Sequence, residues 1–211
     1  MVLYLTTILV AMAVIISFNN LFNDMFLGIS PLWTICVVTL GVIVEIAIDG
    51  LFAIIIQSLP EKWFNKDKKI FDVSKRERKF YEKLNIKSWK DKIFEFGAMG
   101  KFRKNKIYEP NNPKYLERFI VDSNKGLVIH IFGVVFGFLV LLFPLPKYWF
   151  CIGLPIAIVN LFLNLLPIMV LRYNIPKLKV ALLRVTKTLK LKESASGLKK
   201  SDDAIKSDEV A

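Results

Sequence analysis

The chain has 211 residues, 54% of them hydrophobic, and a formal net charge of +12 at pH 7. One histidine and two cysteines exclude a multi-histidine metal site, and no paired-cysteine metal motif is present. No nucleic-acid-binding motif accompanies the basic charge. We therefore expect no metal, no cofactor and no nucleic-acid partner.

Four segments are almost free of charged residues, and each reaches or approaches the ~20 residues that a helix needs to cross a bilayer. They are Val2–Phe18, Pro31–Ile56, Leu127–Leu145 and Tyr148–Leu171. Because the runs are continuously apolar rather than alternating, transmembrane strands are excluded. The first segment has no basic region ahead of it, so we expect a helix there and not a signal peptide. The sequence predicts an all-α integral membrane protein with four transmembrane helices.

The positive charges predict how these helices are oriented. Of the 30 Lys and Arg residues, 19 lie between Ser58 and Gly126, 10 lie from Arg172 onward, and one is Lys147. Basic loops stay on the cytoplasmic side, so both termini are expected in the cytoplasm and the chain in the plasma membrane. The predicted organisation is helices 1 and 2 in residues 1–57, a basic interfacial region in 58–126, helices 3 and 4 in 127–172, a basic segment in 173–192 and a disordered tail in 193–211.

The region between the second and third spans predicts helices that rest on the membrane surface. Lys75–Ile86 places Phe80 and Leu84 four residues apart among charges. Asn112 is an expected helix N-cap ahead of Pro113. Between these helices, residues 88–110 are interpreted as a loop embedded at the interface. The basic face suits anionic lipid or a phosphate-bearing substrate such as an acyl-CoA.

His130 lies three residues into the third span. Histidine is the side chain most readily poised as a proton acceptor near neutral pH, but a polar residue at a helix end is an equal interpretation. Asp122 lies eight residues earlier, on the same helical face if the helix continues through Gly126. We leave that continuity open.

The second span carries two acids, Glu45 and Asp49, four residues apart on one helical face. A carboxylate at such depth costs roughly 2.5–3.5 kcal/mol on insertion scales, so the pair needs partners. Asn160 and Asn164, also four apart, are the candidates. The four residues form either a site for a proton, ion or substrate or a packed polar cluster.

Other features of the spans are expected to serve packing. Gly133 and Gly137 allow close helix approach, and Cys36 and Cys151 are interpreted as packing residues. No P-loop or nucleophile elbow is present, and the acyltransferase pattern of a histidine followed by an acid five residues later is missing because that residue is Val135.

Three blocks of sequence, in order, resemble one known family. They are the Trp-Lys-x-Lys segment with Trp89, Lys90, Lys92 and Ile93, the helix that carries Glu117, Asp122 and His130, and the signature Arg172, Tyr173, Asn174, Pro176 and Leu178. Leu59–Phe64 is similar to a further segment. The family is that of the bacterial glycosyl-4,4'-diaponeurosporenoate acyltransferases, and the resemblance spans roughly residues 45 to 185.

This resemblance implies a membrane acyltransferase of carotenoid biosynthesis that moves a fatty acyl group from a donor, acyl-CoA as co-substrate, to a hydroxyl of a lipid or glycolipid at the cytoplasmic leaflet. We expect His130 to be the general base and Glu117 or Asp122 to orient it or hold the acceptor. Pro176 is expected to end the last helix. The expected substrate-binding residues are Trp89, Lys90, Lys92, Arg172, Tyr173, Asn174 and Lys177. The alternative is a non-enzymatic protein, a small transporter or a scaffold that binds a lipid or ion through Glu45 and Asp49.

Overall fold

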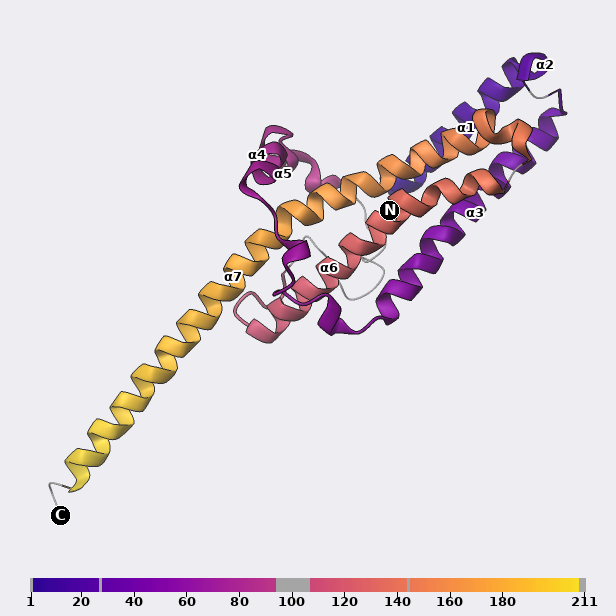
Figure 1. Cartoon of the computed structure of the whole chain (residues 1–211). Coiled ribbons are helices and arrows are strands. Elements are labelled where there is room, and N and C mark those ends of the chain that lie inside the picture. The colour runs from indigo at the N-terminus through magenta and orange to yellow at the C-terminus, as the bar shows by residue number, and fades with distance from the viewer. Residues whose placement is uncertain (1, 27, 94–106, 144, 209–211) are drawn as a thin grey trace.

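The computed structural model describes residues 2–26, 28–93, 107–143 and 145–208, and all regular structure in these ranges is helical. Four helices are long and apolar enough to cross a membrane. They are α1 (Val2–Leu21), α3 (Pro31–Ser58), α6 (Pro113–Phe136) and α7 (Leu154–Asp208). In Figure 1 they form one elongated bundle, from which α7 extends toward the C-terminus. The predicted fold class is confirmed.

Local signals in the sequence fix where the spanning helices begin. Ser30 caps α3 by accepting a hydrogen bond from the Trp33 amide, and Pro31 occupies the first turn, where no amide donor is needed. Asn112 caps α6 in the same way, by accepting from the Tyr115 amide ahead of Pro113. The short helix α2 (Asn23–Phe26) lies between α1 and α3. The predicted N-cap at Asn112 is confirmed.

Helix α6 joins two predicted elements into one. The sequence does not decide whether the helix continues through Gly126, and the structure shows an unbroken helix from Pro113 into the third span. Leu116, Ile120 and Leu127 are buried along this length. A Cβ atom at Gly126 would lie 3.7 Å from Leu171 Cδ1, so the glycine marks packing against α7 and not a break. A 3-10 segment, η5 (Gly137–Leu142), extends the span.

The end of the bundle near α2 closes with irregular turns. The chain passes through η6 (Pro146–Tyr148) and a π-helical turn, η7 (Trp149–Gly153), before α7 begins. Asn19 donates from Nδ2 to the Cys151 carbonyl at 2.8 Å and so ties α1 to this turn. Cys36 and Cys151 are both free thiols.

Helix α7 is longer than the sequence predicts. Pro176 does not end the helix, which runs on through Asp208 where we expected a disordered tail from Glu193. A proline removes one helical hydrogen bond and crowds the carbonyl four residues earlier. Packing outweighs this cost, because Ile175 and Leu178 are buried beside the proline. No proline follows Pro176, and leucine and lysine, which favour helix, are frequent beyond it.

Residues 59–93 form what we call the surface segment, which lies against α7 and α6 (Figure 1). It contains η1 (Glu61–Trp63), η2 (Lys69–Phe71), α4 (Lys75–Lys83), α5 (Ile86–Trp89) and η3 (Lys90–Lys92). Tyr81 and Ile86 are buried against Val170 and Tyr173 of α7. Phe80 stays 53% exposed, as expected of a helix resting on a membrane. The central part of the predicted interfacial loop, residues 94–106, lies outside the described residues.

Candidate functional site

Buried polar side chains from three spanning helices meet inside the bundle. Asn160 Nδ2 donates to Glu45 Oε1, and Asn164 Nδ2 donates to Asp49 Oδ2 at 3.1 Å. The four-residue spacing on α3 matches the four-residue spacing on α7, so each acid meets one amide. Glu45, Asn160 and Asn164 are each 5% exposed. The predicted pairing of the acids with the asparagines is therefore present, and we call these residues together with His130 the polar cluster.

His130 belongs to this cluster, which its position in the sequence did not suggest. Its Nδ1 lies 2.8 Å from Asn164 Oδ1. The Asn164 Nδ2 group faces three acceptors, Asp49 Oδ2, Asn160 Oδ1 and the Asn160 carbonyl, so Oδ1 is the atom turned to histidine. An oxygen acceptor requires a proton on Nδ1, and the neutral imidazole then carries its lone pair on Nε2.

Two glycines of α6 make room for the cluster. A Cβ atom at Gly133 would lie 2.6 Å from Asn164 Oδ1, and one at Gly137 would lie 2.6 Å from Glu45 Oε1. The Gly133 carbonyl also accepts a hydrogen bond from Asn160 Nδ2 at 3.3 Å. The glycine pair expected to serve helix packing therefore also shapes the site.

The polar cluster lies farther into the bundle than the end that carries the surface segment. Lys125, itself 6% exposed, donates to the Gln57 carbonyl at 2.8 Å and marks that level on α6 and α3. At 1.5 Å per residue, His130 lies about 8 Å deeper than Lys125, and Asp49 lies about 12 Å deeper than Gln57. The polar cluster therefore lies within the spanning part of the bundle.

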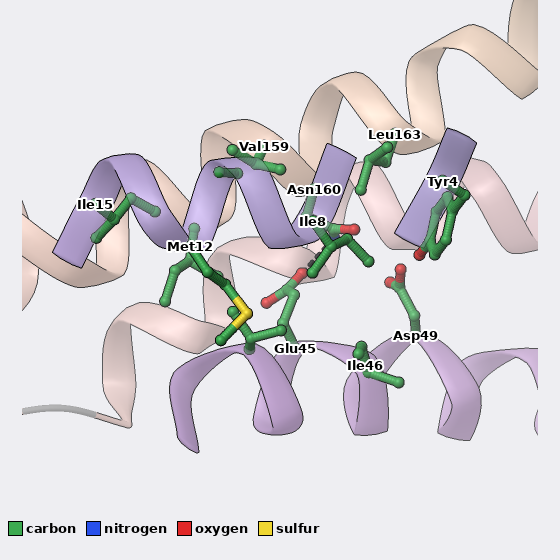
Figure 2. Close-up of a pocket in the computed structure, with 13 residues that line it drawn as sticks. Tyr4, Ile8, Met12, Ile15, Glu45, Ile46, Asp49, Val159, Asn160 and Leu163 are labelled. Atoms are coloured by element: carbon green, nitrogen blue, oxygen red, sulfur yellow. Dashed lines mark hydrogen bonds between the residues drawn. The ribbon is translucent and has the colours of Figure 1, made fainter. Parts of the chain in front are cut away.

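The two acids line an apolar groove between α1, α3 and α7 (Figure 2). Its walls are apolar, and its polar lining consists of Tyr4, Glu45, Asp49 and Asn160. Figure 2 shows the Tyr4 hydroxyl turned toward the Asp49 carboxylate. A second hollow shares Tyr4 and three apolar residues with the first and reaches Ile93 of the surface segment. The groove and this adjoining hollow together extend from the polar cluster to the surface segment.

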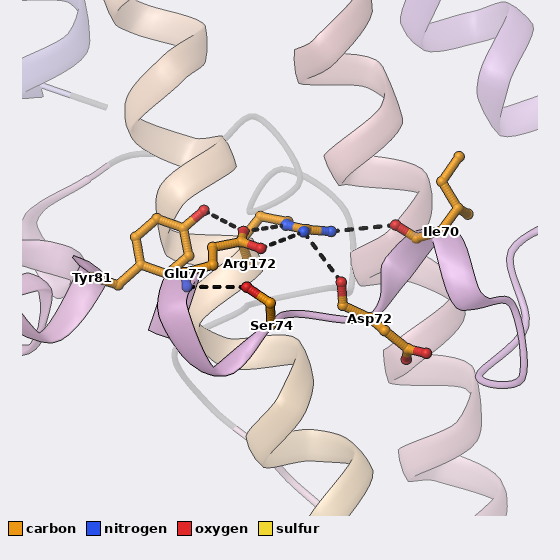
Figure 3. Close-up of polar contacts among 6 residues, drawn as sticks. All are labelled: Ile70, Asp72, Ser74, Glu77, Tyr81 and Arg172. Atoms are coloured by element: carbon orange, nitrogen blue, oxygen red, sulfur yellow. Dashed lines mark hydrogen bonds and ion pairs between the residues drawn. The ribbon is translucent and has the colours of Figure 1, made fainter. Parts of the chain in front are cut away.

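A second polar group, which we call the latch, joins the surface segment to α7 (Figure 3). Arg172 donates from Nε and Nη2 to the two carboxylate oxygens of Glu77, both at 2.7 Å. Further bonds run from the guanidinium to the carbonyls of Ile70 and Asp72. Tyr81 donates its hydroxyl proton to Glu77 Oε1 at 2.6 Å. Bidentate pairing of this kind fixes both position and orientation.

The latch changes the acidity of its surface-segment members. The Arg172 hydrogen bonds hold the pKa of Glu77 below its ordinary value, with the Tyr81 hydroxyl and the Ser74 backbone contact acting in the same direction. Burial, together with the Glu77 carboxylate, raises the pKa of Tyr81 to about 12. Glu77 is thus an anion and Tyr81 a neutral donor at neutral pH.

The latch places Arg172 in an internal contact, although we expected it to bind substrate. Its guanidinium meets one carboxylate and two carbonyls of the surface segment. Tyr173 is buried, and Lys177 Nζ lies 3.4 Å from the centre of its ring. The signature block of α7 therefore holds the surface segment in place.

The remaining residues expected to bind substrate lie around the surface segment. Trp89 Nε1 donates to the Leu84 carbonyl at 3.0 Å, Lys90 lies 3.6 Å from the Asp91 carboxylate, and Asn174 is half-buried. The side chain of Lys92 lies outside the described residues.

The two acids expected to assist His130 are far from it along α6. Glu117 pairs with Lys66 of the surface segment at 2.5 Å, and both side chains are exposed. Because α6 is continuous, Asp122 is separated from His130 by about 12 Å and Glu117 by about 20 Å along the helix axis. Side chains of this length cannot bridge such distances. Asp49 is instead the acid that is linked to His130, through hydrogen bonds to Asn164.

The arrangement was only partly visible in the sequence. The spacing of the acids and asparagines indicated their pairing, whereas the Asn164–His130 contact depends on how α6 and α7 face each other. Glu77 gave no signal as the partner of Arg172, because it is one charge among many in Lys75–Lys83.

Comparison with known families identifies the chain. A family model described as glycosyl-4,4'-diaponeurosporenoate acyltransferase matches residues 60–184, more than half of the sequence. Comparisons with curated proteins and with solved structures find no match. The matched range contains His130, Asn160, Asn164 and the latch, whereas Glu45 and Asp49 precede it. The chain therefore belongs to the glycosyl-4,4'-diaponeurosporenoate acyltransferase family.

Proposed function

We propose that this protein is a membrane-bound acyltransferase that moves a fatty acyl group from acyl-CoA to a hydroxyl of a lipid or glycolipid acceptor, such as a carotenoid glycoside. Family membership supports the reaction class. The single observation that carries the site is the hydrogen-bonded chain Asp49–Asn164–His130. It holds the one histidine of the chain in a fixed tautomer inside the bundle.

In this mechanism His130 Nε2 accepts the proton of the acceptor hydroxyl as the hydroxyl oxygen attacks the thioester carbonyl. The carbon–sulfur bond breaks as the ester forms, and the proton on the imidazolium passes to the leaving thiolate. Asn164 and Asp49 act as positioning residues, because they keep Nδ1 protonated and the ring in one orientation. An imidazole held in this way needs no reorganisation during the transfer.

The apolar groove and the surface segment supply the binding surfaces of this proposal. Alkyl chains would lie in the groove and the adjoining hollow, which together extend from the acids to Ile93. Lys90 and Lys177 would provide positive charge for the anionic head of the donor. We assign this end of the bundle to the cytoplasmic leaflet of the plasma membrane, because most basic residues lie there.

One observation favours a second function, non-enzymatic binding of a lipid or ion. Among the described residues, Glu45 Oε2 and Asp49 Oδ1 have no hydrogen-bond partner although both are buried. A binding protein of this kind would depend on the two acids and not on His130. The two functions are therefore separable by substitution.

The test is donor turnover in lipid–detergent micelles. Purified protein is incubated with a long-chain acyl-CoA and a lipid extract of the source cells, and free CoA is measured. We expect release by the wild type, loss of at least about 100-fold in His130→Ala, and full release in the control Ile131→Ala, whose side chain faces outward. No release by the wild type, while a known acyltransferase releases CoA in the same extract, would contradict the proposal.

A further inference from the structure

The two acids of the apolar groove present unused hydrogen-bond acceptors to it. Glu45 is 5% exposed, and its Oε2 has no partner among the described residues; the same holds for Asp49 Oδ1. Figure 2 shows both carboxylates extending from α3 toward α1 and α7. Burying an acceptor without a partner costs about 1–3 kcal/mol, and more for a charged group. A hydrogen-bond donor carried by a molecule in the groove would remove this cost.

The walls of the groove indicate which kind of molecule would carry that donor. They are formed by aliphatic side chains and Met12, and the adjoining hollow adds Phe162 and Leu166. A hydrated metal ion finds few ligands in such walls, and no cluster of three or more metal-ligating side chains occurs in the described part of the chain. Apolar walls of this kind suit a hydrocarbon chain, which would carry the hydrogen-bond donors itself.

The position of the two acids along α3 determines how deep in the membrane such donors would lie. Asp49 lies nine residues and Glu45 thirteen residues from the end of α3 at Ser58, or about 13 and 20 Å along the axis. A donor that meets both acids is therefore held well below the membrane surface. The two acceptor oxygens come from adjacent turns of one helix, so one ligand that carries two hydroxyl groups can reach both.

We infer that the groove between α1, α3 and α7 is a lipid-binding site in which Glu45 Oε2 and Asp49 Oδ1 accept hydrogen bonds from two neighbouring hydroxyl groups on a long hydrocarbon chain. The ligand enters sideways from the bilayer between the helices. If this ligand is the acyl acceptor, the inference rests on the proposed function, because Asp49 then links the bound lipid to His130 through Asn164. The binding itself does not depend on any acyl transfer.

The test is competitive photolabelling of the full chain in lipid nanodiscs. The probe is a long alkyl chain with a vicinal diol at its middle and a diazirine near one end. Competitors are the unlabelled diol, the matching mono-alcohol and the plain hydrocarbon. We expect labelled peptides from α1, α3 and α7, and the diol to compete at least about fivefold better than the mono-alcohol. This advantage disappears in Glu45→Leu and Asp49→Leu, and it persists in Ile43→Ala, whose side chain faces outward on the same helix.

Equal competition by all three compounds in the wild type overturns the inference, and so does an advantage of the diol that survives in the leucine variants. If either leucine variant fails to fold, judged by its size-exclusion profile, Glu45→Gln and Asp49→Asn decide, and the advantage must shrink in both. CoA release is measured on the same samples. A diol preference without CoA release contradicts the proposed function alone, whereas CoA release without a diol preference contradicts this inference alone.

Discussion

Single residues set the chemistry of both polar groups in this bundle. In the polar cluster, the hydrogen bond to Asp49 orients the Asn164 amide, and the amide oxygen in turn orients the His130 ring. In the latch, Glu77 satisfies two donors of one guanidinium and accepts a third bond from Tyr81. Removing one member of such a network leaves its partners with unsatisfied polar atoms. Substitutions in these groups should therefore have larger effects than substitutions of exposed charges.

The latch predicts a clear contrast between two glutamates of α4. Glu77→Gln removes the charge from a bidentate pair whose side chains are about one fifth to one quarter exposed, and we expect a loss of about 1–2 kcal/mol. Glu82 forms an exposed pair with Arg78 at 3.5 Å, so Glu82→Gln should change stability by less than about 0.5 kcal/mol. Thermal unfolding in detergent measures both variants. Equal melting temperatures for the two would contradict the assigned role of the latch.

The same residue predicts a pH dependence. The pKa of Glu77 lies below its ordinary value of 4.5, mainly because Arg172 bonds to the carboxylate. The folded protein therefore holds this proton less tightly than the unfolded chain, and the pair contributes its full stability above that ordinary value. The contribution is lost as the pH falls through the lowered pKa. Melting curves of the wild type and Glu77→Gln should differ at neutral pH and converge in acid; a gap independent of pH would count against the ion pair.

At the level of elements, close approach of α6 to α3 and α7 builds the site. Gly133 and Gly137 leave no room for a methyl group beside Asn164 and Glu45. The surface segment in turn is held on α7 by the latch and by Lys179, which lies 2.7 Å from Asp72 Oδ1. Because Ile93 of this segment lines the hollow that adjoins the groove, docking of the segment sets the shape of that hollow.

The glycines give the sharpest test at this scale. Gly133→Ala and Gly137→Ala should each cost about 1–3 kcal/mol through overpacking, and Gly133→Ala should also lower acyl transfer because Asn164 must move. Gly50→Ala and Gly126→Ala are the controls, since a Cβ atom meets nothing within 4 Å at Gly50 and makes an ordinary contact at Gly126. Unfolding temperature and CoA release are measured for all four. Full activity in Gly133→Ala would argue against a reaction centre at the polar cluster.

At the scale of the whole molecule, the order of apolar segments was sufficient to predict four spanning helices. Composition decides this outcome, because lipid admits only segments that satisfy their own backbone groups. The boundaries were less predictable where packing outweighs local preference, as at Pro176, which α7 passes through. The polar contacts were predictable where both partners keep a helical spacing, as for Glu45 with Asn160. They were not predictable for Arg172 and Glu77, which lie 95 residues apart in the sequence.

The charge distribution predicts the orientation of the molecule. Cys36 and Cys151 are replaced by alanine, and a single cysteine is introduced either at Lys62 or at Asn23. We expect a membrane-impermeant maleimide to label the Asn23→Cys variant in intact cells and the Lys62→Cys variant only after the cells are lysed. The reverse pattern would place the basic surface segment outside the cell.

The central claim is that His130 acts as the base in acyl transfer and that Asn164 acts through it. The most direct measurement is a double-mutant cycle on single-turnover transfer of a radiolabelled acyl group to the lipid acceptor. His130→Ala and Asn164→Leu should each slow the transfer, His130→Ala by at least about 100-fold. The double variant should be no slower than His130→Ala alone, because Asn164 has no effect once the imidazole is gone. Two effects that multiply in the double variant, or full transfer by His130→Ala, would contradict the account.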